Sequence, residues 1–250
     1  MALFDDVQAF VREANRIARL EDLKTLLVGA VDCFGFDHVA LIHHISLKDV
    51  GGDPVEVITY PQVWQELHLE RGYLSDDPVL TACQTSAAAF VWSEVGSIIA
   101  LTPRQKEILG SASRCGLGDG FTAPVNVPGE ILGSCSFSMR MGRDLPREAL
   151  PAAQYIGCFA FEAARRIQRA TQGPGGRDLS RPRLTPRQFD CLVLAAQGKS
   201  DWHIGQLLGI AQDTVHQHME DAKRRYGVSS RAQLIVRSLF DSQITFSDVY

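Results

Sequence analysis

The first 35 residues carry two runs of hydrophobic positions at helical spacing. Apolar residues that recur every three or four positions form one face of an amphipathic helix, so we expect two helices to open the chain. Gly35 is placed to end the second helix. The apolar positions are Leu3, Val7, Phe10, Ala14 and Ile17 in the first run and Leu23, Leu26, Leu27, Ala30, Val31 and Phe34 in the second.

Strand-like and helical segments then alternate up to residue 170. The pattern predicts strands at 38–46, 55–59, 90–92, 120–127 and 131–140, with turns at 51–54 and at Pro128-Gly129. Helices are expected over 61–71, after Asp77-Pro78, from Thr102-Pro103 onward and over 147–169. Because the strands pair mostly as hairpins between helices, we expect an α-β-α sandwich with an antiparallel sheet.

The end of the chain predicts four short helices. Thr185 and Ser230 each precede a glutamine at the third following position, which is the pattern of a capping box. Ser200 can cap a second helix that ends at Gly209, and a third helix is expected from about 212 to 226. Two short helices joined by a tight turn form a helix-turn-helix. The fold class is therefore α+β, with an all-α four-helix helix-turn-helix domain at the C-terminus.

Residues 171–183 combine glycine, proline and charge with little to bury, which predicts a linker. The chain then divides into domains at 1–170 and 184–250. Ala211, just before the third C-terminal helix, has no side-chain group that can cap it. We expect this to cost about 1 kcal/mol unless Asp213 compensates.

Composition favours a soluble, cytoplasmic protein. Hydrophobic residues make up 45% of the chain and charged residues 22%, which are ordinary values for a globular protein. No apolar run approaches the roughly 18 residues that span a membrane. The first residues lack the pattern of a signal peptide, and six scattered cysteines fit a reducing compartment.

The net charge of −4 divides unevenly along the chain. From Gly176 onward there are ten Lys and Arg against eight Asp and Glu, a balance of +2, whereas the remainder has 15 against 21. A domain so weakly basic is expected to bind DNA modestly alone and to depend on dimerisation for affinity.

Aromatic and polar residues gather between residues 60 and 92. Trp64 and His68 lie four positions apart, on one face of the expected helix, and Asp77 follows nearby. Two Trp, two Tyr, a His and a carboxylate are typical of a pocket for a small amphipathic ligand. An alternative is a helix that packs its aromatic residues on the sheet, with Asp77 as a surface cap before Pro78.

Two resemblances cover the whole chain. The C-terminal stretch resembles the LuxR-type DNA-binding domain, although Gln188 stands where that family usually has Glu and Ala211 where it usually has Ser. Residues 1 to 170 resemble the autoinducer-binding domain of LuxR-type quorum-sensing regulators. The matching positions are Leu184-Thr185-Pro186-Arg187, Leu192, Gly198, Ile204, Leu208-Gly209-Ile210, Thr214-Val215, His218 and Gly227-Val228, and, in the first domain, Tyr60-Pro61-x-x-Trp64, Asp77-Pro78, Phe90-x-Trp92, Gly116, Gly120, Pro124 and Gly133-Ser134-Cys135-Ser136.

The resemblance implies an N-acyl-homoserine lactone or related small signal as ligand, with no other cofactor. Trp64 would donate to the lactone carbonyl and Asp77 would accept the amide N–H. Tyr60 and Ser136 would donate to the amide carbonyl, and Trp92 would pack on the lactone ring. Val63, Leu67 and Val79 would line the acyl chain. His68 replaces the usual Tyr, which leaves the acyl group and the ligand class open.

The expected DNA-reading residues lie on the third C-terminal helix. In a helix-turn-helix the second helix enters the major groove, so His216, Gln217 and Glu220 are expected at base edges. A homodimer held by helices 147–169 and 231–240 would read a two-fold operator with half-sites about 34–36 Å apart. The expected phosphate contacts are Lys199, Thr214, Lys223, Arg224 and Arg231.

Three other functions fit less well. A metal site at Cys33, His38, His43 and His44 is disfavoured, because on a strand His43 faces away from the other two histidines. Hydrolysis would need a Gly-x-Ser-x-Gly turn, which 133–137 is not. A phosphoacceptor regulator needs an Asp after parallel strands, and Asp5-Asp6 has no strand before it. A regulator with a different ligand, or none, remains the alternative.

Overall fold

The computed structural model describes residues 2–44, 55–127, 132–171 and 182–249. It separates into two compact units, an N-terminal unit that ends at Gly176 and a C-terminal unit that begins at Arg177. Most of the expected linker, and both expected turns at 51–54 and Pro128-Gly129, lie outside the described residues. No helix in the described ranges has the length and apolar character needed to cross a membrane.

The N-terminal unit is built on a five-stranded sheet in the order β2-β1-β5-β4-β3, and every strand pairs antiparallel with its neighbours. This confirms the antiparallel sheet expected from the sequence. The strands are β1 (His38–His43), β2 (Glu56–Ile58), β3 (Phe90–Val91), β4 (Leu117–Val125) and β5 (Gly133–Arg140). β5 lies at the centre, so both of its faces are covered.

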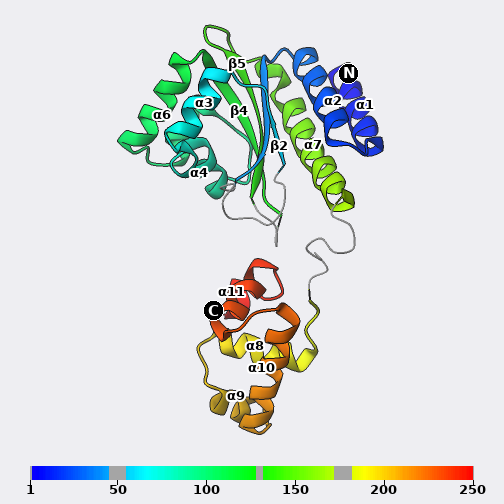
Figure 1. The fold of residues 1–250 in the computed structure, drawn as a ribbon, viewed down its shortest axis with the longest axis vertical. Helices are drawn as coiled ribbons and strands as arrows, with labels where there is room; N and C mark the ends of the chain where they lie inside the picture. The colour runs from blue at the N-terminus through cyan, green and yellow to red at the C-terminus, as the bar shows by residue number, and fades with distance from the viewer. Residues whose placement is uncertain (1, 45–54, 128–131, 172–181, 250) are drawn as a thin grey trace. The chain divides into compact units, whose positions relative to one another are not determined.

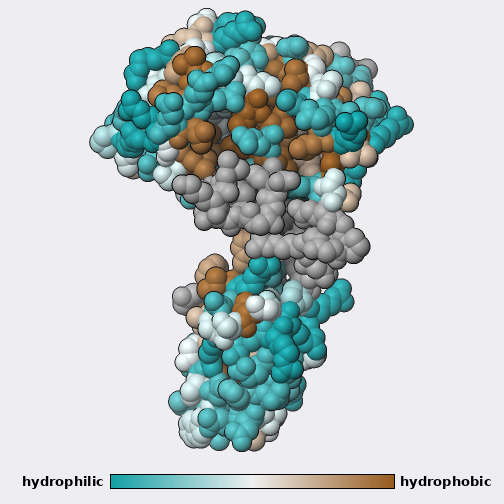
Figure 2. Space-filling view, viewed as in Figure 1, coloured by the Kyte–Doolittle hydropathy of each residue, from teal (hydrophilic) through white to brown (hydrophobic). Residues whose placement is uncertain are grey.

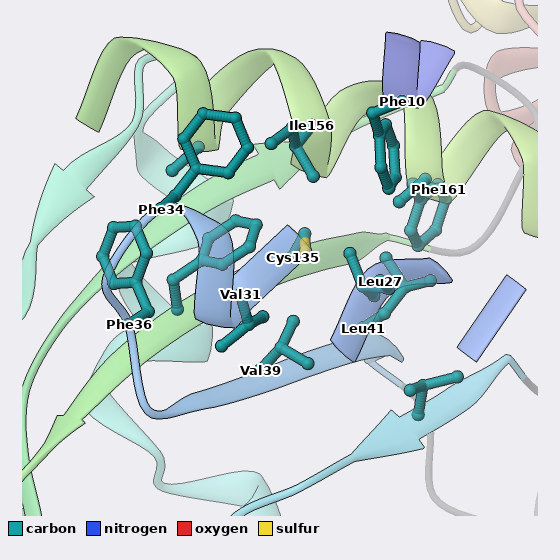
Figure 3. Packing of buried hydrophobic residues seen from close by; sticks show 14 of the residues in the cluster. Phe10, Leu27, Val31, Phe34, Phe36, Val39, Leu41, Cys135, Ile156 and Phe161 are labelled. Carbon is teal, nitrogen blue, oxygen red and sulfur yellow. The ribbon is translucent and has the colours of Figure 1, made fainter. Parts of the chain in front are cut away.

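One face of the sheet is covered by α1 (Ala2–Arg16), α2 (Leu20–Cys33) and α7 (Leu150–Thr171) (Figure 1). Side chains from these helices and from β1 and β5 point toward one another in the main core (Figure 3). A Cβ on Gly157 of α7 would lie 2.9 Å from the Cβ of Cys135, so the missing side chain lets α7 approach β5 closely. The long helix begins later than expected, because residues Arg147–Ala149 form a separate 3-10 turn.

The other face is covered by α3 (Gln62–Glu70), α4 (Pro78–Thr85) and α6 (Pro103–Arg114) (Figure 1). The short α5 (Val95–Ile98) packs against α4. Helices on both faces confirm the α-β-α sandwich. The sequence pattern did not predict α5 or the 3-10 turns Tyr73–Ser75 and Trp92–Glu94. Trp92 was expected in a strand, but β3 stops one residue earlier and the Trp92 ring lies over Gly120 of β4.

The C-terminal unit contains the four expected helices, α8 (Pro186–Ala196), α9 (Asp201–Leu208), α10 (Gln212–Tyr226) and α11 (Arg231–Phe240), and a short α12 (Phe246–Val249) that was not predicted. Both predicted capping boxes form, at Thr185 and at Ser230. Gly209 ends α9 with a left-handed φ of 67°. Ala211 gives α10 no side-chain cap, and among the described residues Asp213 makes no hydrogen bond that replaces it.

Candidate functional site

A row of serines lines one face of the central strand. Ser134, Ser136 and Ser138 are all buried, on the face of β5 opposite to Cys135, Phe137 and Met139 of the main core. They therefore face the layer that contains α3, α4 and α6. Serines at every second position in a strand flanked by core residues were the sequence signal for this polar row.

Ser136 joins a chain of polar contacts that reaches two aromatic residues. Its hydroxyl lies 2.8 Å from the Thr122 hydroxyl of β4, and the Trp92 indole N–H donates to the same Thr122 oxygen at 2.7 Å. The Tyr60 phenol lies against Ser136, and burial raises the pKa of Tyr60 well above its ordinary value, which the Ser136 contact opposes. Tyr60 is therefore a neutral hydrogen-bond donor. Thr122 was missed by sequence analysis, because a lone threonine in a strand carries no functional signal.

Trp64 of α3 lies in a group of aromatic side chains next to these polar contacts. Its ring centroid lies 5.3 Å from that of His68 and 5.9 Å from that of Tyr73, and Trp64 and Tyr73 are both buried. Tyr60 contacts the Trp92 ring edge-on at a centroid distance of 6.2 Å. The indole N–H of Trp64 donates to none of the described residues. Val63 does not line the site as expected; it is 64% exposed, because the helical register that buries Trp64 turns its neighbour outward.

Asp77 has two structural roles. One carboxylate oxygen accepts the backbone N–H of Val79 at 2.8 Å and of Leu80 at 3.3 Å, so Asp77 caps α4. The other lies 3.2 Å from His68 Nε2. Asp77 therefore does cap a helix, as the alternative interpretation expected. It does not lie on the surface, however, because its side chain is mostly buried and contacts His68 of the aromatic group. Capping leaves part of the carboxylate's accepting capacity open.

A second polar group lies further along the serine row. His44 Nε2 lies 2.8 Å from the Ser134 hydroxyl, and the buried Cys83 of α4 also contacts Ser134. Burial lowers the pKa of His44 to about 4, an effect that Asp77 opposes, so the imidazole is neutral at pH 7. Burial raises the pKa of the Cys83 thiol to about 12. Sequence analysis weighed His44 only as a metal ligand and did not single out Cys83 or Ser134 as ligand contacts.

Three buried polar atoms of this layer have no hydrogen-bond partner in the part of the chain that the structure describes: Nδ1 of His44, Nε2 of His38 and Oγ of Ser138. His38 Nδ1 bonds the Thr59 carbonyl oxygen at 2.8 Å, so in the neutral ring Nε2 is an acceptor. His43 instead contacts Phe161 of α7 on the opposite face. Among the described residues no group of three His, Cys, Asp or Glu has the arrangement of a metal site.

The second candidate site is the exposed side of α10. Val215 and Met219 are buried against the other C-terminal helices, whereas Asp213, Thr214, His216 and Gln217 are exposed. Glu220 is partly exposed on the same side. This orientation matches a helix whose N-terminal half is free to meet base edges.

Several expected phosphate contacts are engaged within the unit. Lys223 lies 2.5 Å from Glu220, and Arg224 lies 3.2 Å from Asp221. Arg231 binds Asp201 and the Lys199 carbonyl oxygen, which ties α11 to the start of α9. Lys199 and Thr214 are exposed. The structure thus brings the six ligand-site residues together in one unit and the DNA residues in the other, while their contacts to ligand and DNA stay predictions.

The chain matches two families. A family of autoinducer binding domains matches residues 19–164, and the luxR family of bacterial regulatory proteins matches residues 182–238. These two matches cover well over half of the sequence and follow the division into two units.

Several known proteins are similar to this chain over most of its length. The transcriptional activator BjaR1 of Bradyrhizobium diazoefficiens is 26% identical over 92% of both chains. The quorum sensing-dependent transcriptional regulator RpaR of Rhodopseudomonas palustris is 29% identical over 72% of this chain and 71% of its own. A crystal structure of Escherichia coli SdiA matches the fold with a TM-score of 0.66 at 19% identity, over 96% of this chain and 98% of that one. A second structure holds SdiA in complex with octanoyl-rac-glycerol, also with a TM-score of 0.66.

Proposed function

The chain belongs to the LuxR family of autoinducer-binding transcription regulators, and we propose that its N-terminal unit binds an N-acyl-homoserine lactone or a close chemical relative. The observation that carries the proposal is the indole N–H of Trp64, which has no acceptor among the described residues, on one side of His68, with the carboxylate of Asp77, which retains accepting capacity, in contact with the same histidine. An acyl-homoserine lactone offers a lactone carbonyl as acceptor and an amide N–H as donor, and these two groups match it.

The remaining residues complete the proposed contacts. Trp64 donates to the lactone carbonyl, while Asp77 accepts the amide N–H in a charge-assisted bond. Tyr60 and Ser136, already in contact with each other, donate to the amide carbonyl. Trp92, held by Thr122, packs on the ring. His68 would reach the ligand through Asp77, which it already contacts.

Two conservative substitutions test this site. In Asp77→Asn the side chain still caps α4, because Asn is as good a cap as Asp, but the charge is lost. In Trp64→Phe the aromatic packing stays and the N–H is lost. We expect both variants to fold and to lose the rise in melting temperature that acyl-homoserine lactones give the full chain. Trp202→Phe, at an exposed tryptophan of α9, is the matched control and should respond as the natural protein does.

If both variants keep an unchanged ligand response, the assignment is wrong. A chain that responds to no acyl-homoserine lactone would favour the alternative, a regulator with a different ligand or none, to which the change from Tyr to His at position 68 points. Mass spectrometry of small molecules that co-purify with the protein, expressed in medium conditioned by signal-producing bacteria, would then identify the ligand. A phosphoacceptor regulator is disfavoured by the antiparallel sheet.

For the C-terminal unit we propose binding to double-stranded DNA as a homodimer, through His216, Gln217 and Glu220 at base edges and Lys199, Thr214, Lys223, Arg224 and Arg231 at phosphates. An apolar stripe of Ala232, Val236 and Phe240 is exposed along α11 and supports pairing there. The operator would be two-fold, with half-sites about 34–36 Å apart. Val236→Asp should lower operator affinity and dimer content together, as measured by gel shift and analytical ultracentrifugation.

The proposed domain limits are 1–170 and 184–250, with a linker at 171–183. DNA binding places the protein in the cytoplasm, and its role as a regulator needs no catalytic residue, metal or cofactor. Ligand burial would stabilise the folded N-terminal unit by mass action.

A further inference from the structure

The proposed contacts determine which end of the ligand lies at which end of the serine row on β5. Trp92, proposed to pack on the lactone ring, lies over Gly120, and Gly120 pairs with Ser138. Leu117, further along the same edge, clusters with Trp64 and Tyr73. The ring therefore belongs at the Ser138 end. The acyl group must run from Ser136 toward Ser134, which lies two residues and about 7 Å along the strand.

The far end of this path is polar. Ser134 contacts both His44 and Cys83 there. Ser134 and Cys83 are fully buried. A plain alkyl chain would bring only apolar atoms to these groups and would leave their hydrogen-bonding capacity unused, which carries a free-energy cost in a buried site.

His44, at this end of the path, has one ring nitrogen that still needs a hydrogen-bond partner. One ring nitrogen contacts Ser134, and the other, Nδ1, is buried with no partner among the described residues. A neutral imidazole has one donor and one acceptor nitrogen, and Ser134 can serve either. The nitrogen left over therefore fits a hydroxyl group, which can donate or accept.

We propose that the acyl group of the natural ligand carries a hydroxyl group that hydrogen-bonds Nδ1 of His44, while Ser134 holds the imidazole ring through Nε2. This inference rests on the proposed function and specifies its ligand class further: an acyl-homoserine lactone hydroxylated along or at the end of its acyl group. Cys83 of α4 lies on the other side of Ser134.

The test varies the position of a hydroxyl group on an acyl group of constant length. Affinities of the full-length protein are measured for hexanoyl-homoserine lactone and for its 3-, 4-, 5- and 6-hydroxy derivatives. We expect one hydroxylated form to bind roughly threefold to tenfold more tightly than the parent, the gain of one neutral hydrogen bond. His44→Leu should remove that preference while binding of the parent is retained or improved. Ser134→Ala should reduce the preference, and it gives an independent readout if His44→Leu does not fold.

His43→Leu is the matched control, because the same change at the neighbouring histidine falls on the α7 face and should leave the preference intact. If the parent binds as tightly as every hydroxylated form, or if the preference survives both His44→Leu and Ser134→Ala, the inference is overturned while the proposed function stands. If no member of the series binds, the proposed function falls and this inference falls with it.

Discussion

At the scale of single residues, Gly120 shows how one absent side chain shapes the ligand site. A Cβ at this position would lie 2.5 Å from the Trp92 ring, well inside contact distance. The ring rests on the bare backbone of β4, and this placement brings its indole N–H to Thr122. The position of Trp92 thus depends on a residue that has no side chain.

Gly120→Ala should therefore destabilise the N-terminal unit by about 1–3 kcal/mol, because the added methyl overpacks the Trp92 site. Denaturant unfolding followed by tryptophan fluorescence measures the change. Gly29→Ala is the control: this helical glycine of α2 is exposed with open space around its Cβ, and alanine should stabilise it by roughly 0.5–1 kcal/mol. Equal effects of the two substitutions would contradict the overpacking argument.

His44 gives a prediction about pH. Its folded pKa of about 4 lies below the ordinary value of 6.5, so the fold favours the neutral ring. Its contribution to stability is complete above about pH 6.5 and is lost as the pH falls toward 4. Between about pH 7 and 4.5 the natural protein should lose roughly 2–3 kcal/mol more than His44→Leu.

Chemical denaturation of both proteins across this range measures the difference. Carboxylates titrate in both chains, so their contribution cancels in the comparison. Parallel pH profiles would show that His44 is not held neutral by burial.

At the scale of elements, features set by residues close in sequence could be predicted, and features set by distant residues could not. The boxes at Thr185 and Ser230 involve residues three positions apart, and both formed as predicted. The end of β3 before Trp92 depends on Gly120, which lies 28 positions away, and α5 is too short to show a period.

The ligand site divides in the same way. Trp64 and Asp77 were identified through spacing that resembles a family, and the structure brings them near Tyr60, Trp92 and Ser136. The sequence did not point to His44 and Ser134 as candidate ligand contacts, because polar residues on a strand normally indicate a face exposed to solvent. Only the presence of helices on both faces of the sheet turns them into buried polar groups.

The uncapped start of α10 leads to a prediction for that helix. Ala211→Ser should add the missing cap and stabilise α10 by about 1 kcal/mol. Hydrogen exchange on the full chain should then show slower exchange of the first amides of the helix. Ser230→Ala, which removes an existing cap from α11, should change exchange there by a similar amount in the opposite direction. No slowing in Ala211→Ser would mean that this terminus is already satisfied.

At the scale of the whole molecule, the distribution of charge leads us to expect weak DNA binding by a single copy. The chain carries a net charge of −4, and cations of α10 pair with carboxylates on the same helix. Part of the positive charge available for phosphates is thus neutralised by carboxylates within the helix that is proposed to read DNA. Affinity must come from pairing two copies and from specific base contacts.

Glu220→Gln should release Lys223 from its ion pair and strengthen binding to DNA of arbitrary sequence. The slope of log K against log salt concentration should steepen by about one unit, the effect of roughly one added phosphate contact. Fluorescence anisotropy over a salt series measures this slope. Glu21→Gln, on α2 of the N-terminal unit, makes the same change in net charge and should leave the slope unaltered. If both substitutions steepen it equally, net charge matters rather than the pairing on α10.

The central strand β5 has a consequence for how such a protein can diversify. One face presents the serine row to the proposed ligand site, and the other packs Cys135 against Gly157 of α7. A larger residue in this strand would disturb the ligand layer and the main core at once. New ligand preferences should therefore arise more easily on α3, which faces solvent on its other side. Substitutions in β5 should therefore be rare among related proteins, and substitutions in the helices that surround the site should be more frequent.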